Sequence, residues 1–134
     1  MHHRYLLDTC VLLDCLFKYD SLGSKTKEML EQENTFLAVS VASIWEVTIK
    51  NKKHPELMPI SGSELHSLLK QLEISIVPIR AEHAKASAVF MDEKIHNDPF
   101  DHIILATAAI DGYILLTKDE KVTQYRNGRA LLVN

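Results

Sequence analysis

Residues 98–119 read DPFDHIILATAAIDGYILLTKD, and this stretch predicts a helix, a turn and a strand in that order. The opening Asp-Pro pair is typical of a helix N-cap followed by the first helical residue. The apolar run that follows predicts a helix to about Ile110, and Gly112 stands where a helix end often takes the left-handed conformation. Residues 113–116 form a continuously apolar strand candidate, and the acidic Asp119 comes soon after it. We therefore expect a helix that leads into a buried strand with a carboxylate near its end.

The same alternation of helices and short apolar strands extends over the rest of the chain. Further strands are predicted at 5–7, 35–39, 74–79 and 130–133, and further helices at 9–18, 25–32, 41–51, 63–72, 81–94 and 120–125. We expect Ser24 to cap the second helix and Gly62 to lie in a linker, with Ser63 starting the next helix. Because the strands are apolar rather than alternating, the pattern is typical of a parallel sheet covered on both faces. Residues 1–134 are therefore expected to form one α/β domain, a three-layer α/β/α sandwich.

The composition excludes several classes of protein. The 134 residues are 46% hydrophobic and 25% charged, which is ordinary for a globular protein and argues against disorder. Lys and Arg total 15 against 18 Asp and Glu, and the net charge of −3 excludes a generally basic surface for nucleic acid. No apolar run approaches a membrane span and no signal-peptide pattern precedes Asp8, so we expect a cytoplasmic protein. Cys10 and Cys15 are expected to be reduced, buried thiols.

Carboxylates stand where an open parallel sheet is expected to bind its ligands. Asp8 directly follows the first strand and Asp119 closely follows the fourth, and such sheets bind ligands beyond the carboxyl ends of their strands. Glu46 lies within an apolar helix segment, where a buried carboxylate needs a partner. Asp98 and Asp101, three residues apart, share one face of a helix start. Carboxylates suit Mg²⁺ or Mn²⁺, which can activate water for phosphodiester cleavage.

Each of these residues also has a purely structural explanation. Three of the acids could simply cap the helices that follow them: Asp8, Asp98 and Asp119. Glu46 could lie on the exposed side of its helix, Asp101 could favour the helix dipole, and Thr117 could merely end a strand. Each residue alone is thus a weak indication, and the prediction of a metal site rests on their joint placement.

Other polar residues near these acids are candidates for substrate contact. His96 and His102 flank the acidic helix start, whereas most of the histidines are expected to be solvated. Lys50 opens a basic segment that could contact phosphates. Thr9 and Lys118 each adjoin one of the strand-end acids. The sequence contains no GxSxG element and no glycine-rich phosphate loop, so acyl transfer and nucleotide binding of those kinds are not indicated.

Four segments, in this order, resemble a known family. They are Leu6-Leu7-Asp8-Thr9, Ser40-Val41-Ala42-Ser43-Ile44-Trp45-Glu46-Val47, His96-Asn97-Asp98-Pro99-Phe100-Asp101 with the apolar run after it, and Leu116-Thr117-Lys118-Asp119. Over essentially its whole length the chain resembles a PIN domain. More narrowly, it is similar to VapC-like toxins of type II toxin–antitoxin systems, in the subgroup with an HxDPFD segment.

The resemblance implies a parallel α/β/α sandwich and a ribonuclease that depends on Mg²⁺ or Mn²⁺. It implies a catalytic and metal-binding set of four acids: Asp8, Glu46, Asp101 and Asp119. Asp98 would be an auxiliary acid, and Thr117 would support the metal ligands or the substrate. Members of this family commonly form homodimers and are neutralised by a small antitoxin.

We therefore predict an endoribonuclease that cleaves RNA phosphodiester bonds and acts as the toxin of a toxin–antitoxin pair. One alternative is a PIN nuclease that acts in RNA processing, or on DNA, outside any toxin pair. A small antitoxin-like neighbouring gene would favour the toxin. A second alternative is a non-catalytic binding module whose acids bind basic side chains of a protein partner. Such a module would have no affinity for Mg²⁺ or Mn²⁺.

Overall fold

The computed structural model describes residues 3–134, and its helices and strands alternate along the chain. In chain order they are β1 (His3–Leu7), α1 (Thr9–Phe17), the 3₁₀ helix η1 (Tyr19–Ser21), α2 (Ser24–Glu31), β2 (Thr35–Ser40), α3 (Val41–Lys53), α4 (Gly62–Gln71), β3 (Ser75–Val77), α5 (Ala81–Glu93), α6 (Pro99–Asp111), β4 (Ile114–Thr117), α7 (Glu120–Thr123) and β5 (Ala130–Leu132). Every predicted helix and strand is present, within a few residues of the expected ends.

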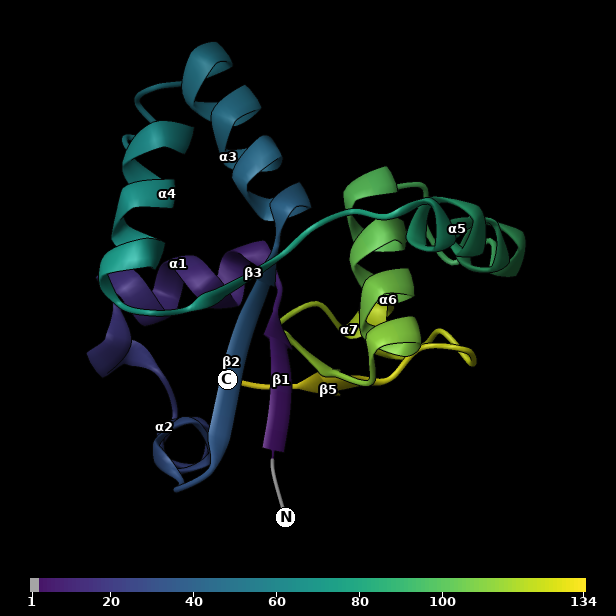
Figure 1. The fold of residues 1–134 in the computed structure, drawn as a ribbon, viewed down its shortest axis with the longest axis horizontal. Helices are drawn as coiled ribbons and strands as arrows, with labels where there is room; N and C mark the ends of the chain where they lie inside the picture. The colour runs from purple at the N-terminus through teal and green to yellow at the C-terminus, as the bar shows by residue number, and fades with distance from the viewer. Residues whose placement is uncertain (1–2) are drawn as a thin grey trace.

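The five strands of residues 3–134 form one parallel sheet in the order β3-β2-β1-β4-β5. The central strand β1 pairs with β2 on one side and with β4 on the other. After β3 the chain passes across to α5, α6 and then β4, on the far side of β1 (Figure 1). The strand order therefore reverses at β1. Such a switch point is where open α/β sheets place their ligand crevice, beyond the carboxyl ends of the strands.

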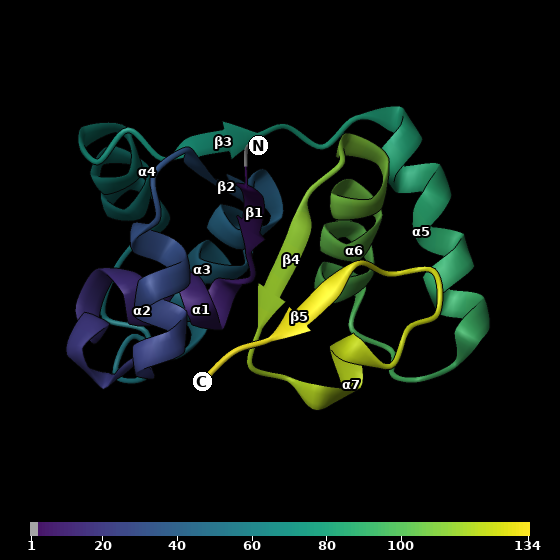
Figure 2. The same cartoon turned by 90° about the horizontal axis from the view of Figure 1, so that it is seen from below.

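Helices cover both faces of the sheet, so the predicted three-layer α/β/α architecture is confirmed (Figure 2). Leu6 packs into a core with α5 and α6, whereas Tyr5 and Leu7 pack on the opposite face with α1, α3 and α4. Leu6, Leu7 and Leu116 are completely buried, and burying a leucine of this kind contributes about 1.5–3 kcal/mol each. This double burial explains why the strands are apolar throughout.

Two predicted helix starts are wrong: a contact with the end of the chain lies at the first, and a local capping box explains the second. The N-cap of α2 is Gly23 rather than Ser24; a Cβ there would lie 2.2 Å from Oδ1 of Asn134. Helix α4 begins at Gly62 and is capped by Ser61. The Ser61 hydroxyl accepts the Glu64 N–H, and the Glu64 carboxylate accepts the Ser61 N–H, both at 3.1 Å. This capping box satisfies two backbone donors and allows the helix to start at a glycine.

Ser61→Ala is expected to lower the free energy of unfolding by about 1 kcal/mol, because it removes the side-chain acceptor of the capping box. Urea unfolding followed by circular dichroism measures the change. Ser63→Ala is the matched control, because Ser63 is exposed and lies two residues into the helix. A larger loss for Ser63→Ala than for Ser61→Ala would show that the cap is assigned to the wrong residue.

The expected burial of the two cysteines is wrong for Cys10, which is exposed, and Cys15 is half-buried. Partial burial still raises the pKa of both thiols, that of Cys15 to about 11. The expectation of solvated histidines is wrong for His83 and His102, which are buried. His83 accepts the Arg80 N–H and bonds to a carboxylate 28 residues away. Within residues 3–134, no helix combines the length and the apolar character needed to cross a bilayer.

Candidate active site

The carboxyl ends of β1 and β4 lie side by side and open into a cavity of about 490 Å³. Leu7 pairs with Leu116 across the two strands, and the Asp8 N–H donates to the Leu116 carbonyl at 3.1 Å. The cavity is lined by Asp8, Cys10, Lys118, Asp119, Glu120 and Lys121. Asp8 and Asp119 therefore line one crevice, at the switch point of the sheet.

Three of the acids do cap helices, as their structural explanation predicted. In each case the Oδ1 atom accepts a backbone N–H at 2.9 Å, for the residues Asp8, Asp98 and Asp119. The caps orient the carboxylates, because a capping side chain must point along the helix axis at the first turn. Capping uses only the Oδ1 atom of each carboxylate, so the Oδ2 atom can still bind a ligand.

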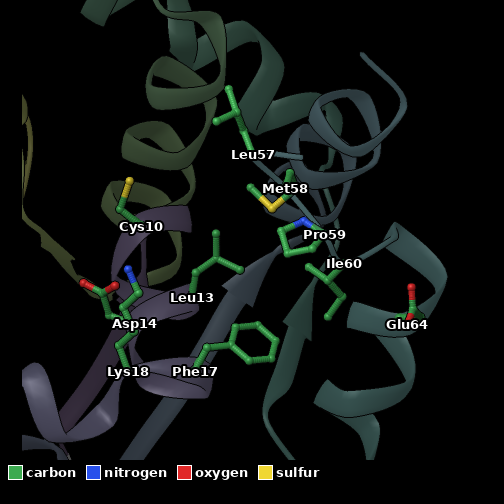
Figure 3. A pocket seen from close by; sticks show the side chains of 10 residues that line it. All are labelled: Cys10, Leu13, Asp14, Phe17, Lys18, Leu57, Met58, Pro59, Ile60 and Glu64. Atoms are coloured by element: carbon green, nitrogen blue, oxygen red, sulfur yellow. The ribbon is translucent and has the colours of Figure 1, made fainter. Parts of the chain in front are cut away.

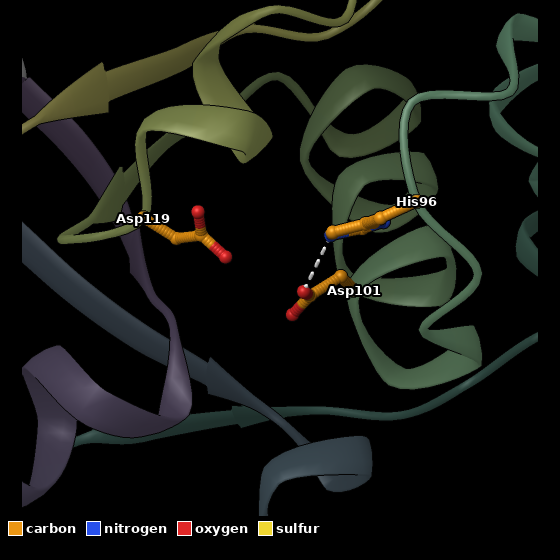
Figure 4. Close-up of side chains that lie close together, drawn as sticks. All are labelled: His96, Asp101 and Asp119. Atoms are coloured by element: carbon orange, nitrogen blue, oxygen red, sulfur yellow. Dashed lines mark hydrogen bonds and ion pairs between the residues drawn. The ribbon is translucent and has the colours of Figure 1, made fainter.

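Asp101 and His96 come together with Asp119, which also lines the crevice (Figure 4). One ligand atom of each residue lies within 4.8 Å of the other two. The His96 Nε2 and Asp101 Oδ2 atoms are 2.9 Å apart, and both side chains are partly buried. His96 was a candidate for substrate contact, and the structure instead places its ring nitrogen among possible ligand atoms.

Burial and mutual repulsion raise the pKa of two of the acids. Burial is the main cause of a raised pKa for Asp8, and the charges of Glu46 and Asp119 raise it further. Burial also raises the pKa of Asp101 to about 6, with further contributions from the charges of Asp98 and Asp8 against an opposing effect of His96. These couplings put the carboxylates in one electrostatic neighbourhood with an excess of negative charge. A bound cation would relieve that excess.

Glu46 is held in place by residues of two helices. The Thr9 hydroxyl donates to Glu46 Oε1 at 2.7 Å and also lies 2.9 Å from Ser43 Oγ. The Lys50 ammonium group binds Glu46 Oε2 at 2.7 Å. The Glu46 side chain is only 12% exposed, so its charge needs this partner. Thr9 and Lys50, both predicted as substrate contacts, are thus engaged with Glu46.

Thr117 and Lys118 lie between the two strand-end acids. Thr117 is fully buried, and its hydroxyl accepts the Asp119 N–H at 3.1 Å. A hydrogen bond with Thr117 also lowers the pKa of Asp8, opposing the effect of burial. Thr117 therefore links Asp8 to Asp119 from beneath the crevice. Lys118 is exposed at the edge of the crevice and forms an ion pair with Asp14.

The substrate contact predicted for His102 conflicts with its position. His102 is only 4% exposed, and its Nε2 lies 3.0 Å from the His96 carbonyl and 3.2 Å from the Tyr125 hydroxyl. The same hydroxyl lies 2.7 Å from His96 Nδ1, so Tyr125 and His102 support His96 from behind. Sequence reasoning missed Tyr125, because no local pattern links residues 29 positions apart.

The donors gathered here fit a hard divalent cation. Carboxylate oxygens predominate, and one imidazole nitrogen joins them, a set that suits Mg²⁺ or Mn²⁺. Burial is the main cause of the raised pKa of Asp8 and of Asp101, and neighbouring carboxylates add to it, so a bound cation would stabilise the ionised form of both. Asp8, Asp101 and Asp119 would hold the ion, with His96 beside them, whereas both oxygens of Glu46 already bind Thr9 and Lys50.

Comparison with known families decides what kind of domain carries this crevice. The model of the PIN domain family matches residues 5–128, which include all four acids. The chain belongs to the PIN domain family. PIN domains are nucleases that generally use divalent metal ions, in keeping with the acidic crevice of this PIN domain. No curated protein matches the chain.

Solved structures of toxin–antitoxin proteins share the fold of this PIN domain. One is VapBC2 from Rickettsia felis bound to a promoter DNA fragment, with a TM-score of 0.70, 18% identity, and coverage of 98% of this chain and 99% of that chain. VapBC-1 from nontypeable Haemophilus influenzae has a TM-score of 0.68, 12% identity, and coverage of 96% and 97%. A toxin–antitoxin complex from Klebsiella pneumoniae has a TM-score of 0.64, 23% identity, and coverage of 95% of each chain. At sequence identities of 12–23%, these similarities show a shared fold and nothing further.

Proposed function

We propose that this PIN domain is a Mg²⁺- or Mn²⁺-dependent endoribonuclease and the toxin of a toxin–antitoxin pair. The observation that carries the nuclease proposal is the convergence of Asp8, Asp101 and Asp119 at the switch point, with Glu46 beside them. The raised pKa values of Asp8 and Asp101 support it, because titratable groups that burial and neighbouring charges perturb in this way are common at functional sites.

A role follows for each group from its surroundings. A divalent ion would supply Lewis acidity toward the phosphate and lower the pKa of a bound water. Asp8, Asp101 and Asp119 would hold that ion. Glu46 would orient the attacking water and accept its proton as general base, with Thr9 and Lys50 fixing the carboxylate.

The remaining candidates would position these groups or attract the substrate. Thr117 would fix Asp8 and Asp119 relative to each other, and Asp98 would hold the start of α6 that carries Asp101. Lys118 is exposed at the crevice and would attract phosphate groups.

A groove beside the crevice supports an antitoxin as the partner. A cavity of about 660 Å³ lies between α1 and the segment that joins α3 to α4 (Figure 3). Phe17 is 55% exposed and Leu57 is 76% exposed along it, and exposed apolar surface of this kind often marks a protein interface. Cys10 lines both this cavity and the acidic crevice, so a chain bound in the groove would reach the site.

The relatives in fold also support the toxin assignment, because several are toxin–antitoxin complexes. The homodimer and the HxDPFD subgroup that the resemblance implies stay predictions, and so does the cytoplasmic location expected from the sequence.

Purified protein is expected to cleave single-stranded RNA when Mg²⁺ or Mn²⁺ is present and to lose that activity completely in EDTA. The physical reason is that the clustered carboxylates alone would repel a phosphodiester. Gel analysis of labelled RNA measures cleavage, and sequencing of the cleaved ends gives the target. Single-stranded DNA of the same sequence tests the alternative of a DNA nuclease.

Two results would count against this function. Cleavage that persists unchanged in EDTA would exclude the metal-dependent reaction. Absence of cleavage together with absence of Mg²⁺ and Mn²⁺ binding in calorimetry would favour the non-catalytic binding module.

A further inference from the structure

Trp45 is an exposed aromatic residue of α3. It is the only tryptophan of the chain, and 58% of it is exposed. It lies on α3 directly before Glu46, and its ring packs against Phe100 on α6, directly before Asp101. The aromatic pair therefore bridges two helices that each carry one of the acids.

The packing of the pair fixes the indole ring and leaves surface free for a ligand. The two ring centroids are 5.3 Å apart and the ring planes meet at 76°, an edge-to-face arrangement. Among residues 3–134, Phe100 is the one aromatic neighbour that Trp45 has. A ring held in this way loses little conformational entropy when a second flat group stacks on it.

Helix α3 also carries positive charges that suit a nucleic acid strand. Lys50, Lys52 and Lys53 occupy the last turn of the same helix, and Lys50 is half-exposed while it binds Glu46. Helix α3 thus carries cations for phosphates and a flat apolar face for a base, and the aromatic pair joins it to the start of α6, where Asp101 lies. Single-stranded nucleic acids are bound by this combination of charge and stacking.

We propose that Trp45, braced by Phe100, is a stacking platform for an unpaired RNA base next to the phosphate that is cleaved. The inference rests on the proposed ribonuclease function and adds a determinant of substrate position to it. An unpaired base is required, because the faces of paired bases are covered by their neighbours in the helix. Val41, one turn earlier, is also 37% exposed, so a second protein chain is the competing occupant.

Intrinsic fluorescence tests the platform directly, because Trp45 is the only source of tryptophan emission. The protein is titrated with a short single-stranded RNA, with Ca²⁺ in place of Mg²⁺ to slow cleavage and a gel to verify intact RNA. The matched control ligand is a strand with the same sugar-phosphate backbone that lacks the base at every position. Quenching by the RNA and little quenching by the bound abasic strand are expected. Equal quenching by both ligands would overturn the proposal.

Substitutions at position 45 separate stacking from other roles. Trp45→Leu is expected to raise KM for RNA by about tenfold or more with kcat changed only a few-fold, whereas Trp45→Phe keeps most of the affinity. Met91→Ala is the matched control, because Met91 is equally exposed, at 57%, on α5. An unchanged KM for Trp45→Leu would overturn the proposal.

The remaining outcomes are also decisive. Sedimentation equilibrium compares the mass of the wild type with that of Trp45→Leu. If the wild type is an oligomer, the variant dissociates, and RNA affinity falls only where the oligomer is lost, then Trp45 belongs to a protein interface and the proposal is overturned. Cleavage by the wild type without base-dependent quenching would refute the platform alone. Base-dependent quenching without any cleavage would refute the ribonuclease function instead.

Discussion

Asp101→Asn is expected to lower the rate of metal-dependent RNA cleavage by at least about a thousandfold. Asparagine has the shape of aspartate and retains an oxygen that can accept from His96, whose Nε2 lies 2.9 Å from Asp101 Oδ2. The substitution therefore removes one negative charge and leaves the packing in place. The single-turnover cleavage rate at saturating Mg²⁺ or Mn²⁺ measures the loss. In cells, the same variant should relieve growth inhibition by the protein.

Two further variants make this loss interpretable. Asp92→Asn removes a carboxylate from the exposed surface of α5 and is expected to leave the rate unchanged. Asp8→Asn preserves an acceptor for the Val11 N–H at the start of α1, because asparagine is also a good N-cap. It should nevertheless lose activity as Asp101→Asn does, whereas Asp8→Ala would also remove the cap. Asp101→Asn with nearly wild-type cleavage and unchanged affinity for divalent ions would contradict the proposed site.

Asp101→Asn is also expected to stabilise the metal-free protein at neutral pH, by up to about 3 kcal/mol. The pKa of Asp101 is raised from 3.8 to about 6 in the folded protein. The folded state therefore binds more protons than the unfolded state between these values. Stability contributed by the protonated carboxyl is complete below pH 3.8 and is lost as the pH rises through 6. Asparagine stays neutral and avoids this loss.

Urea unfolding in EDTA at several pH values measures this second effect. The stability difference between Asp101→Asn and the wild type should be largest at pH 7.5 and fall to about half at pH 5. Added Mg²⁺ should reverse the order, because a ligand that binds the folded state stabilises the wild type more than a variant with a damaged site. A difference that does not depend on pH would show that the carboxyl is not destabilised by its surroundings.

Much of the fold followed from local patterns in the sequence. The apolar strands, the Asp-Pro start of α6 and the left-handed Gly112 at its end all act within a few residues, so their consequences are readable from the chain. The placement of Asp8 and Asp119 also followed, because parallel strands end at the same edge of a sheet. The start of α4 differs from the sequence expectation, because Ser61 and Glu64 form a reciprocal capping box across a glycine.

The sequence by itself determined the α/β class, the parallel sheet and the set of acids that could form a site. Only the tertiary structure decided that Lys50 neutralises part of Glu46, that Tyr125 supports His96, and that Trp45 packs on Phe100. The last two contacts join residues from separate parts of the chain, and the first depends on which side of α3 faces the crevice. The raised pKa values of Asp8 and Asp101 likewise arise from burial and from neighbouring carboxylates, which exist only once the chain has folded.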